Sequence, residues 1–192
     1  MNAAAQGGAV GRAVVLELAG TLERVADGLD WSRAEALAAR LDGARRVLLF
    51  GAGRSRGIAL AMGQRFGHVG LDVALIGEGG NRRFDARDVL ILISASGTTR
   101  STIVTGGLAR EAPDGGAILA FTATDPSPVA DLADEVLVIP ARFRSTGPAD
   151  LAPFTAPFDL AALVCGEALA KMVMERRGMD DADIELHRPN VE

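Results

Sequence analysis

Residues 88–102 read DVLILISASGTTRST, a short apolar run that steps directly into a cluster of hydroxyl side chains. Apart from Asp88, the run 88–93 is apolar throughout, as in a strand buried on both faces of a parallel sheet. Six of the nine residues in 94–102 carry a hydroxyl group. Ordinary turns rely on Gly, Asn, Asp and Pro, so this loop is better suited to donating hydrogen bonds than to turning the chain.

Apolar runs of this kind alternate with stretches of helical spacing along the chain. The runs are expected strands and cover 46–50, 72–76, 88–94, 117–123 and 135–140. The helical stretches cover 11–27, 32–43, 56–69, 100–111, 127–134 and 156–177. Short apolar strands separated by helices predict an α/β fold, an open, doubly wound five-stranded parallel sheet with helices on both faces. The expected strand order is 2-1-3-4-5.

A length of 192 residues suits a single domain with a sizeable core. We expect N-terminal helices over 1–45, an α/β core over 46–178, and a polar tail over 179–192 that is either mobile or docked on a partner subunit. The segment 141–155 is the one long irregular loop of the sequence. Long loops in compact domains are usually functional.

Composition and charge exclude several classes of protein. The net charge is −5 and the basic residues are scattered, which argues against a general binder of nucleic acid or membrane surfaces. No run approaches 18 apolar residues and the N-terminus lacks the basic start of a targeting segment, so a cytoplasmic location is expected. Cys165, the single cysteine, is expected to be a buried apolar side chain. The two histidines, His68 and His187, and this cysteine have no metal-ligand spacing, so no metal site is predicted.

Two loops rich in glycine and hydroxyls follow the first and third expected strands, GAGRSRG at 51–57 and SASGTTRST at 94–102. In the expected strand order these strands end side by side, where open α/β sheets bind ligands. Hydroxyls and backbone N–H groups at a helix start make an anion cradle, which the helix dipole strengthens. Helix capping needs one or two hydroxyls rather than six, so the loops predict a terminal phosphate site. The glycine spacing of 51–57 does not fit a dinucleotide fingerprint.

These motifs resemble the SIS (sugar isomerase) domain family. The resemblance rests on GAGRS at 51–55, ISASGTT at 93–99 and FTATDPSPVADLADEVLVIP at 121–140, and it covers nearly the whole chain from residue 11. Within the family, the sequence is most similar to the 6-phospho-3-hexuloisomerases of the ribulose monophosphate pathway. The segments that carry this similarity are RFGHVG at 65–70, PFTAPFD at 153–159 and the ending HRPNVE at 187–192. The chain departs from that pattern at Arg56, Ala95, Thr98 and Asp159, where the family has Gly, Gly, Glu and Glu. In the tail, Pro189 replaces Ala, and His187 lies one position away from the family's histidine.

The resemblance implies a SIS-type three-layer sandwich and a phosphosugar isomerase without a cofactor or a metal. The implied reaction interconverts 3-hexulose 6-phosphate and fructose 6-phosphate through an enediol. The resemblance also implies a homodimer or homotetramer, and the last helical stretch, apolar over a broad arc, agrees with burial on more than one side. Two alternatives stay open, a non-catalytic phosphosugar sensor and an isomerase of a different sugar phosphate.

The resemblance also assigns candidate residues. The substrate phosphate and sugar would be bound by residues of the two loops: Gly53, Arg54, Ser55, Ser94, Ser96, Gly97 and Thr99. Asp159 stands where the family has a glutamate, and it is either the catalytic base or an acidic partner of the helix dipole. His68 and His187 are candidates for donating to the substrate carbonyl oxygen. A packing or subunit-contact role for His68, and a mobile tail at His187, are the alternatives.

Overall fold

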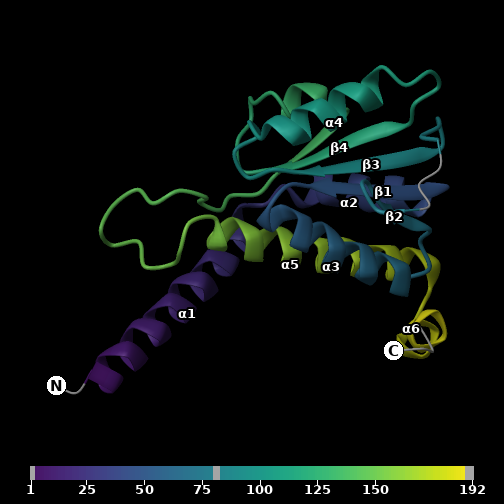
Figure 1. Ribbon diagram of the computed structural model, residues 1–192. Helices are drawn as coiled ribbons and strands as arrows, with labels where there is room; N and C mark the ends of the chain where they lie inside the picture. Colours follow the sequence, from purple (N-terminus) through teal and green to yellow (C-terminus); the bar gives the residue numbers. More distant parts are fainter. Residues whose placement is uncertain (1–2, 80–82, 189–192) are drawn as a thin grey trace.

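The computed structural model describes residues 3–79 and 83–188, and it confirms the open parallel sheet (Figure 1). The strands are β1 (Arg46–Gly51), β2 (Val73–Leu75), β3 (Asp88–Ile93), β4 (Ala117–Thr122) and β5 (Glu135–Val138). All neighbouring strands pair in parallel, in the predicted order β2-β1-β3-β4-β5. The crossovers between them carry helices, as parallel pairing requires.

Helices cover both faces of the sheet, which gives the expected three layers (Figure 1). They are α1 (Ala3–Gly28), α2 (Trp31–Asp42), α3 (Arg54–His68), α4 (Arg100–Arg110), α5 (Ala156–Arg177) and α6 (Asp181–His187). One face packs against α2, α3 and α5, and the other packs against α4 and a short 3₁₀ turn, η1 (Ala130–Leu132). Within the described ranges, no helix is long and apolar enough to cross a membrane.

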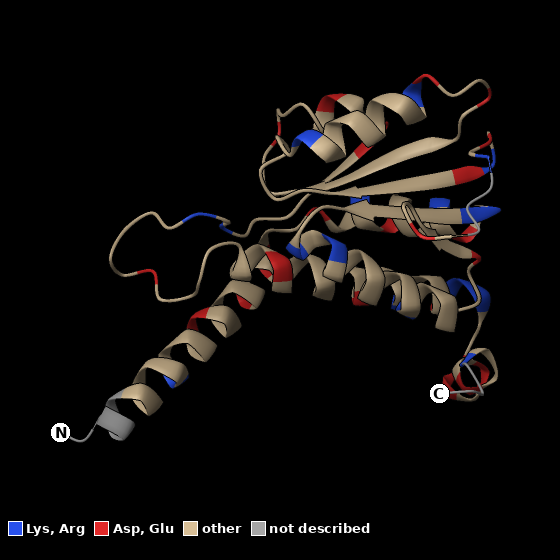
Figure 2. Ribbon diagram, viewed as in Figure 1, with Lys and Arg blue, Asp and Glu red and all other residues tan. Residues whose placement is uncertain are grey.

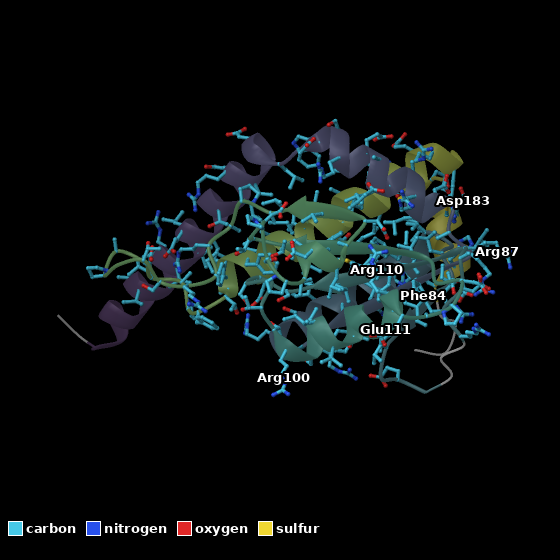
Figure 3. All side chains as sticks on the ribbon, turned by 90° about the horizontal axis from the view of Figure 1, so that it is seen from above. Phe84, Arg87, Arg100, Arg110, Glu111 and Asp183 are labelled. Carbon is cyan, nitrogen blue, oxygen red and sulfur yellow. The ribbon has the colours of Figure 1, made fainter. Side chains whose placement is uncertain are left out.

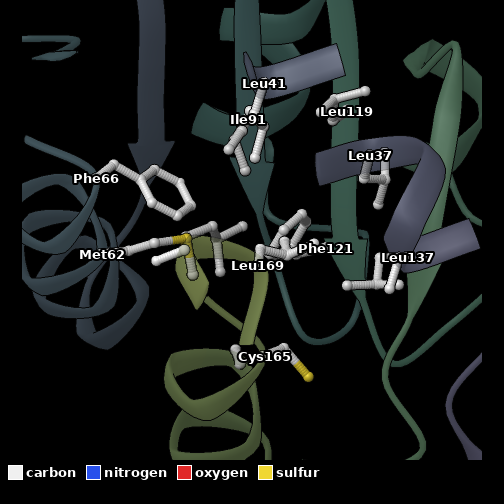
Figure 4. Close-up of a cluster of buried hydrophobic side chains, with 14 of the residues drawn as sticks. Leu37, Leu41, Met62, Phe66, Ile91, Leu119, Phe121, Leu137, Cys165 and Leu169 are labelled. Atoms are coloured by element: carbon white, nitrogen blue, oxygen red, sulfur yellow. The ribbon is translucent and has the colours of Figure 1, made fainter. Parts of the chain in front are cut away.

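The apolar strands fill two separate clusters because successive side chains point to opposite faces. In β3, Ile91 and Ile93 join the larger cluster beneath α3 and α5, whereas Leu92 joins the smaller one beneath α4. Figure 4 shows Met62 of α3 and Leu169 of α5 converging in the larger cluster. Burial on both faces explains why this strand reads as an unbroken apolar run in the sequence.

Three expected elements were wrong in extent. The first helix begins at Ala3 rather than at residue 11, because the alanine-rich start favours a helix despite the glycines that follow it. The helix expected over 127–134 is reduced to η1, since Pro126 and Pro128 remove backbone donors from the start of this segment. The second strand is also shorter than expected, and it lies at the edge of the sheet.

The polar tail contains a short helix, α6, which packs against α3. Asp180 caps this helix by accepting hydrogen bonds from the backbone N–H groups of Ala182 and Asp183, at 2.8 and 3.2 Å. The side chain of Asp183 accepts in turn from the Asp180 N–H, which completes a capping box. The last part of the tail, 189–192, lies outside the described residues.

An ion pair between a buried carboxylate and a partly exposed arginine holds the start of β3 next to the start of β1. The Asp88 side chain is 1% exposed and accepts two hydrogen bonds from the Arg45 guanidinium, at 2.8 and 2.7 Å. It also accepts from the backbone N–H of Asp85 at 3.0 Å. Burial alone would raise the pKa of Asp88, but these hydrogen bonds and the charges of Arg45 and Arg46 outweigh burial and hold the pKa below its ordinary value.

We predict that Asp88→Asn lowers the free energy of unfolding by about 1.5–3 kcal/mol at pH 7, the usual worth of hydrogen bonds to a charged group. A lowered pKa stabilises the fold above the unfolded-state pKa of about 3.9, and this contribution disappears as the pH falls through the folded-state value. Urea unfolding should therefore show a gap between wild type and variant that is full at pH 7 and shrinks below about pH 4. Asp27→Asn, at an exposed position of α1, is the control, and an equal loss in both variants would contradict the role of Asp88.

Candidate active site

A pocket of about 220 Å³ lies at the carboxyl ends of β1 and β3. The two strands end in register, with Gly51 opposite Ile93, so the loops that follow them lie side by side. The helices α3, α4 and α5 all begin at this pocket, and the loop 141–155 forms its remaining wall. Helix N-termini leave backbone N–H groups unpaired and carry the positive end of the dipole, so the pocket suits an anion.

The hydroxyl loop presents two of its side chains to the pocket, Ser96 and Thr99. Ser94 does not line it: this residue is 2% exposed, and its Oγ lies 3.0 Å from Thr99 Oγ1, so it holds that hydroxyl in place. Ser96 Oγ accepts a hydrogen bond from the Thr98 backbone N–H at 3.3 Å. The hydroxyl cluster therefore divides into groups that face the ligand space and groups that support them.

Glycines shape both loops instead of lining the pocket. Gly97 has φ +63°, and a Cβ built on it would lie 2.0 Å from Ser127 Oγ, so no other residue fits there without a shift of the neighbouring chain. Gly53 has φ +57° and ends the loop just before α3. Its neighbours Arg54 and Ser55 line the pocket as predicted.

Asp159 lines the same pocket from the first turn of α5. Its side chain is 6% exposed, and its Oδ2 accepts hydrogen bonds from Arg54 Nε at 2.6 Å and from Thr155 Oγ1 at 2.8 Å. Among the described residues both hydrogen bonds to this carboxylate fall on Oδ2, which leaves Oδ1 for a substrate. Phe158 is buried beside it, whereas Phe154 is 65% exposed at the rim of the pocket.

The two histidines lie away from this pocket within the chain. His68 ends α3, and Arg54 begins it, so the helix separates them by about 21 Å at a rise of 1.5 Å per residue. His68 and His187 instead line a second pocket between α3, β2 and α6, where His187 Nδ1 is 2.8 Å from the carbonyl oxygen of Asp183. A catalytic role for either histidine stays a prediction, and it requires a second subunit.

Six residues that line the pocket were not among the predicted site residues: Phe143, Arg144 and Thr155, and also Ala52, Ala95 and Phe154. The first two belong to the irregular loop 141–155, which has no periodicity to place its side chains. Length was the only signal, because long loops in compact domains tend to carry function. Thr155 has φ +62°, which is uncommon outside glycine, and its hydroxyl donates to Asp159.

Other reactive side chains lie outside the pocket. Cys165 is buried in the core, and burial raises the pKa of its thiol to about 12, so the thiol stays protonated at neutral pH (Figure 4). No cluster of three or more His, Cys, Asp or Glu side chains that could hold a metal occurs in the described parts of the chain.

The sequence pattern of the SIS domain matches residues 40–158, which is more than half of the chain and includes every residue that lines the pocket except Asp159. The chain belongs to the SIS domain family. The pocket therefore lies in a SIS domain at the point where the strand order of the sheet reverses, between β1 and β3.

Named relatives and solved structures agree with this assignment. The 3-hexulose-6-phosphate isomerase of Methylomonas aminofaciens is 28% identical over 93% of this chain and 96% of its own length. The enzyme of the same name from Mycobacterium gastri is 41% identical over 52% of this chain and 49% of its own length. A structure of an Escherichia coli CFT073 protein in complex with A5P superposes with a TM-score of 0.81 at 25% identity, and covers 98% of this chain and 100% of that protein.

Proposed function

We propose that this SIS protein is a cofactor-free phosphosugar isomerase that interconverts 3-hexulose 6-phosphate and fructose 6-phosphate. One observation carries the proposal: a single pocket holds hydroxyls at the start of α4 and a buried carboxylate, Asp159, at the start of α5. The first arrangement suits a terminal phosphate, and the second suits a base that acts on the sugar carbons. The names of two relatives supply the choice of sugar phosphate.

In the proposed reaction, Ser55, Ser96 and Thr99 bind the phosphate together with backbone N–H groups of α4. Asp159 Oδ1 removes the proton from C2 of the 3-hexulose, and the electron pair of that C–H bond forms the double bond of a 2,3-enediol. The electron pair of the C3 carbonyl moves onto its oxygen, which takes up the hydroxyl proton of C2. The proton held by Asp159 then returns to C3, and the C2 oxygen becomes the carbonyl of fructose 6-phosphate. No atoms or electrons are gained or lost in the sequence.

Arg54 is placed to support this proton transfer. Its Nε holds Asp159 Oδ2, and its side chain is 66% exposed, so its terminal N–H groups are open to a ligand. We assign to it the stabilisation of the developing enediolate oxygen, which an oriented guanidinium can provide. Arg54 thereby takes the role that was predicted for a histidine of the same chain, donation to the substrate oxygen, because both histidines line a different pocket. His68 and His187 stay predictions for a site completed across a subunit interface.

The exposed part of α1 supports the prediction of a homo-oligomer. The N-terminal half of α1 extends beyond the sheet and its helices (Figure 1). Three apolar side chains on it, Val10, Val15 and Leu16, are more than half exposed. A projecting helix with an apolar surface needs a partner to be stable, and a second copy of this chain is the partner that we propose. The location of the protein in the cytoplasm also stays a prediction.

We predict that fructose 6-phosphate stabilises the protein, whereas fructose and NAD do not. At 100 times the dissociation constant the gain is about 2.7 kcal/mol, read as a rise in Tm by differential scanning fluorimetry. Ser96→Ala should weaken binding by about 0.5–3 kcal/mol, through loss of a hydrogen bond to the charged phosphate. Ser101→Ala is the matched control, because Ser101 belongs to the same motif but is exposed on α4. An equal shift with NAD would contradict a phosphosugar site.

Asp159→Asn keeps the shape of the side chain and removes the base. We predict a fall in kcat of about 10²–10⁴-fold, the usual contribution of general acid–base catalysis, with little change in the affinity for fructose 6-phosphate. Glu167→Gln is the matched control, since it removes another carboxylate of α5 that pairs with an arginine of α3, Arg65, at 2.7 Å. Normal turnover by the Asn variant would rule out this base, and binding without turnover by wild type would favour a sensor.

We predict that Val10→Asp combined with Val15→Asp dissociates the oligomer. In a lone subunit both positions are exposed, so the charges cost little there, but they oppose burial against a second copy. Light scattering after size exclusion should show a lower mass for this variant. Leu108→Asp, on α4 at the other face of the sheet, is the control. A wild-type protein that is monomeric at micromolar concentration would contradict the proposed interface.

A further inference from the structure

The loop 141–155 joins β5 to α5 and forms one wall of the candidate active site. It contains no helix or strand, and in Figure 1 it extends from the sheet toward α1 before it returns to α5. Phe143 and Arg144 from its first part and Phe154 and Thr155 from its last part line the pocket. The shape of the pocket therefore depends on what holds this loop.

A single carboxylate of α1, Glu17, holds both ends of the loop. Its Oε2 accepts hydrogen bonds from the backbone N–H groups of Leu151 and Ala152, at 2.7 and 2.8 Å. Its Oε1 accepts from the guanidinium of Arg142, near the start of the loop. The hydrogen bond from Arg142 contributes most to holding the pKa of Glu17 below its ordinary value, so this carboxylate is charged at neutral pH.

The loop also closes on itself through the same guanidinium. Arg142 Nε lies 3.3 Å from Asp150 Oδ1, and Arg142 Nη2 donates to the carbonyl oxygen of Ala152 at 3.2 Å. Asp150 in turn accepts from the backbone N–H of Thr146 at 2.5 Å. The side chains of Glu17, Arg142 and Asp150 are only 18–20% exposed, and together they form a clamp between α1 and the loop. Figure 2 shows charged residues of both signs on this loop and acidic residues on α1.

Arg144 differs from the other arginines near the pocket. Arg54 lines the pocket but pairs with Asp159, and Arg100, at the start of α4, points out to solvent (Figure 3). The Arg144 guanidinium carbon lies 5.6 Å from the centre of the Phe143 ring, a cation–π contact that orients the side chain. Among the described residues no carboxylate pairs with Arg144, so its charge is available to a ligand.

We propose that Arg144 is a substrate-binding residue that neutralises the phosphate, and that Glu17 is a positioning residue that presents it through the clamp. This inference rests on the proposed function. The hydroxyls and backbone N–H groups of the cradle carry no net charge, whereas a phosphate monoester is close to a dianion at neutral pH. A guanidinium supplies the missing charge and matches two phosphate oxygens at once.

Binding of fructose 6-phosphate, measured by calorimetry, tests the role of Arg144. We expect Arg144→Gln to raise Kd about 10- to 100-fold, the range for lost hydrogen bonds to a charged group. Arg144→Lys keeps the charge and should bind more tightly than the Gln variant. In turnover assays the loss should fall on KM with kcat nearly unchanged, because phosphate binding is uniform along the reaction. Wild-type affinity in Arg144→Gln would overturn the proposal.

A double-mutant cycle tests the role of Glu17. Glu17→Gln keeps an oxygen for the backbone N–H groups but loses the ion pair with Arg142, and we expect it to raise Kd about 3- to 10-fold, a minor share of the loss expected on removing the charged contact itself. If Glu17 acts through Arg144, the same change made in Arg144→Gln should have almost no further effect. Equal effects in both backgrounds would reduce Glu17 to a structural role and overturn this part of the inference. Asp150→Asn weakens the same clamp and serves as a second variant if Glu17→Gln folds poorly.

The control and the wild type separate the possible failures. Glu135→Gln removes another ion pair between distant elements, with Arg40 at 2.6 Å, and should leave Kd unchanged. If the wild type itself binds no sugar phosphate, the proposed function fails and the inference fails with it. If the wild type binds fructose 6-phosphate and Arg144→Gln binds it equally well, only the inference fails.

Discussion

The parallel pairing of β1 with β3 is the constraint on which the candidate active site depends. Gly51 lies opposite Ile93, so both strands end at one level and both following loops open into one space. Because each loop leads directly into a helix, the N-termini of α3 and α4 gather there with their unpaired N–H groups. Neither loop alone makes a cradle. Their juxtaposition follows from the strand order, in which the chain reverses direction across the sheet between these two strands.

The second constraint is the contact between α3 and α5, which joins residues far apart in the sequence. The ion pair of Arg54 with Asp159 brings a guanidinium and a nearly buried carboxylate together at the mouth of the cradle. A carboxylate with little exposure needs hydrogen bonds to remain there, and Arg54 and Thr155 supply them on one oxygen. The arrangement keeps the carboxylate fixed in orientation while one oxygen stays open, which is what a proton transfer between adjacent carbons requires.

Local patterns in the sequence were sufficient for the sheet and for the two loops. Runs such as VLILI are buried on both faces, and the hydroxyls of Ser96 and Thr99 face the pocket as their position after a strand predicted. The ion pair of Arg54 with Asp159 was not predictable, because no local pattern links residues that meet only through helix packing. Arg144 was missed for a related reason: its loop is held by Glu17, a residue of the first helix.

The histidines are a different case, because the sequence assigned them to the site and the fold places them away from it within the chain. His68 and His187 were grouped with the site by resemblance, and the fold brings the two together, but at the far end of α3. Residue type and family position do not reveal which subunit's pocket a side chain serves. The predicted catalytic role of the two histidines therefore requires a homo-oligomer, whereas the roles proposed for Asp159 and Arg54 require only one chain.

The central claim is that a base in this pocket acts on the carbons next to the ketone of a phosphosugar. The most direct measurement is proton NMR of fructose 6-phosphate incubated with the protein in D₂O. A 2,3-enediol predicts that deuterium replaces the hydrogen at C3 and leaves both hydrogens at C1 untouched. Deuterium at C1 alone, or at neither carbon in a protein that binds fructose 6-phosphate, would contradict the account.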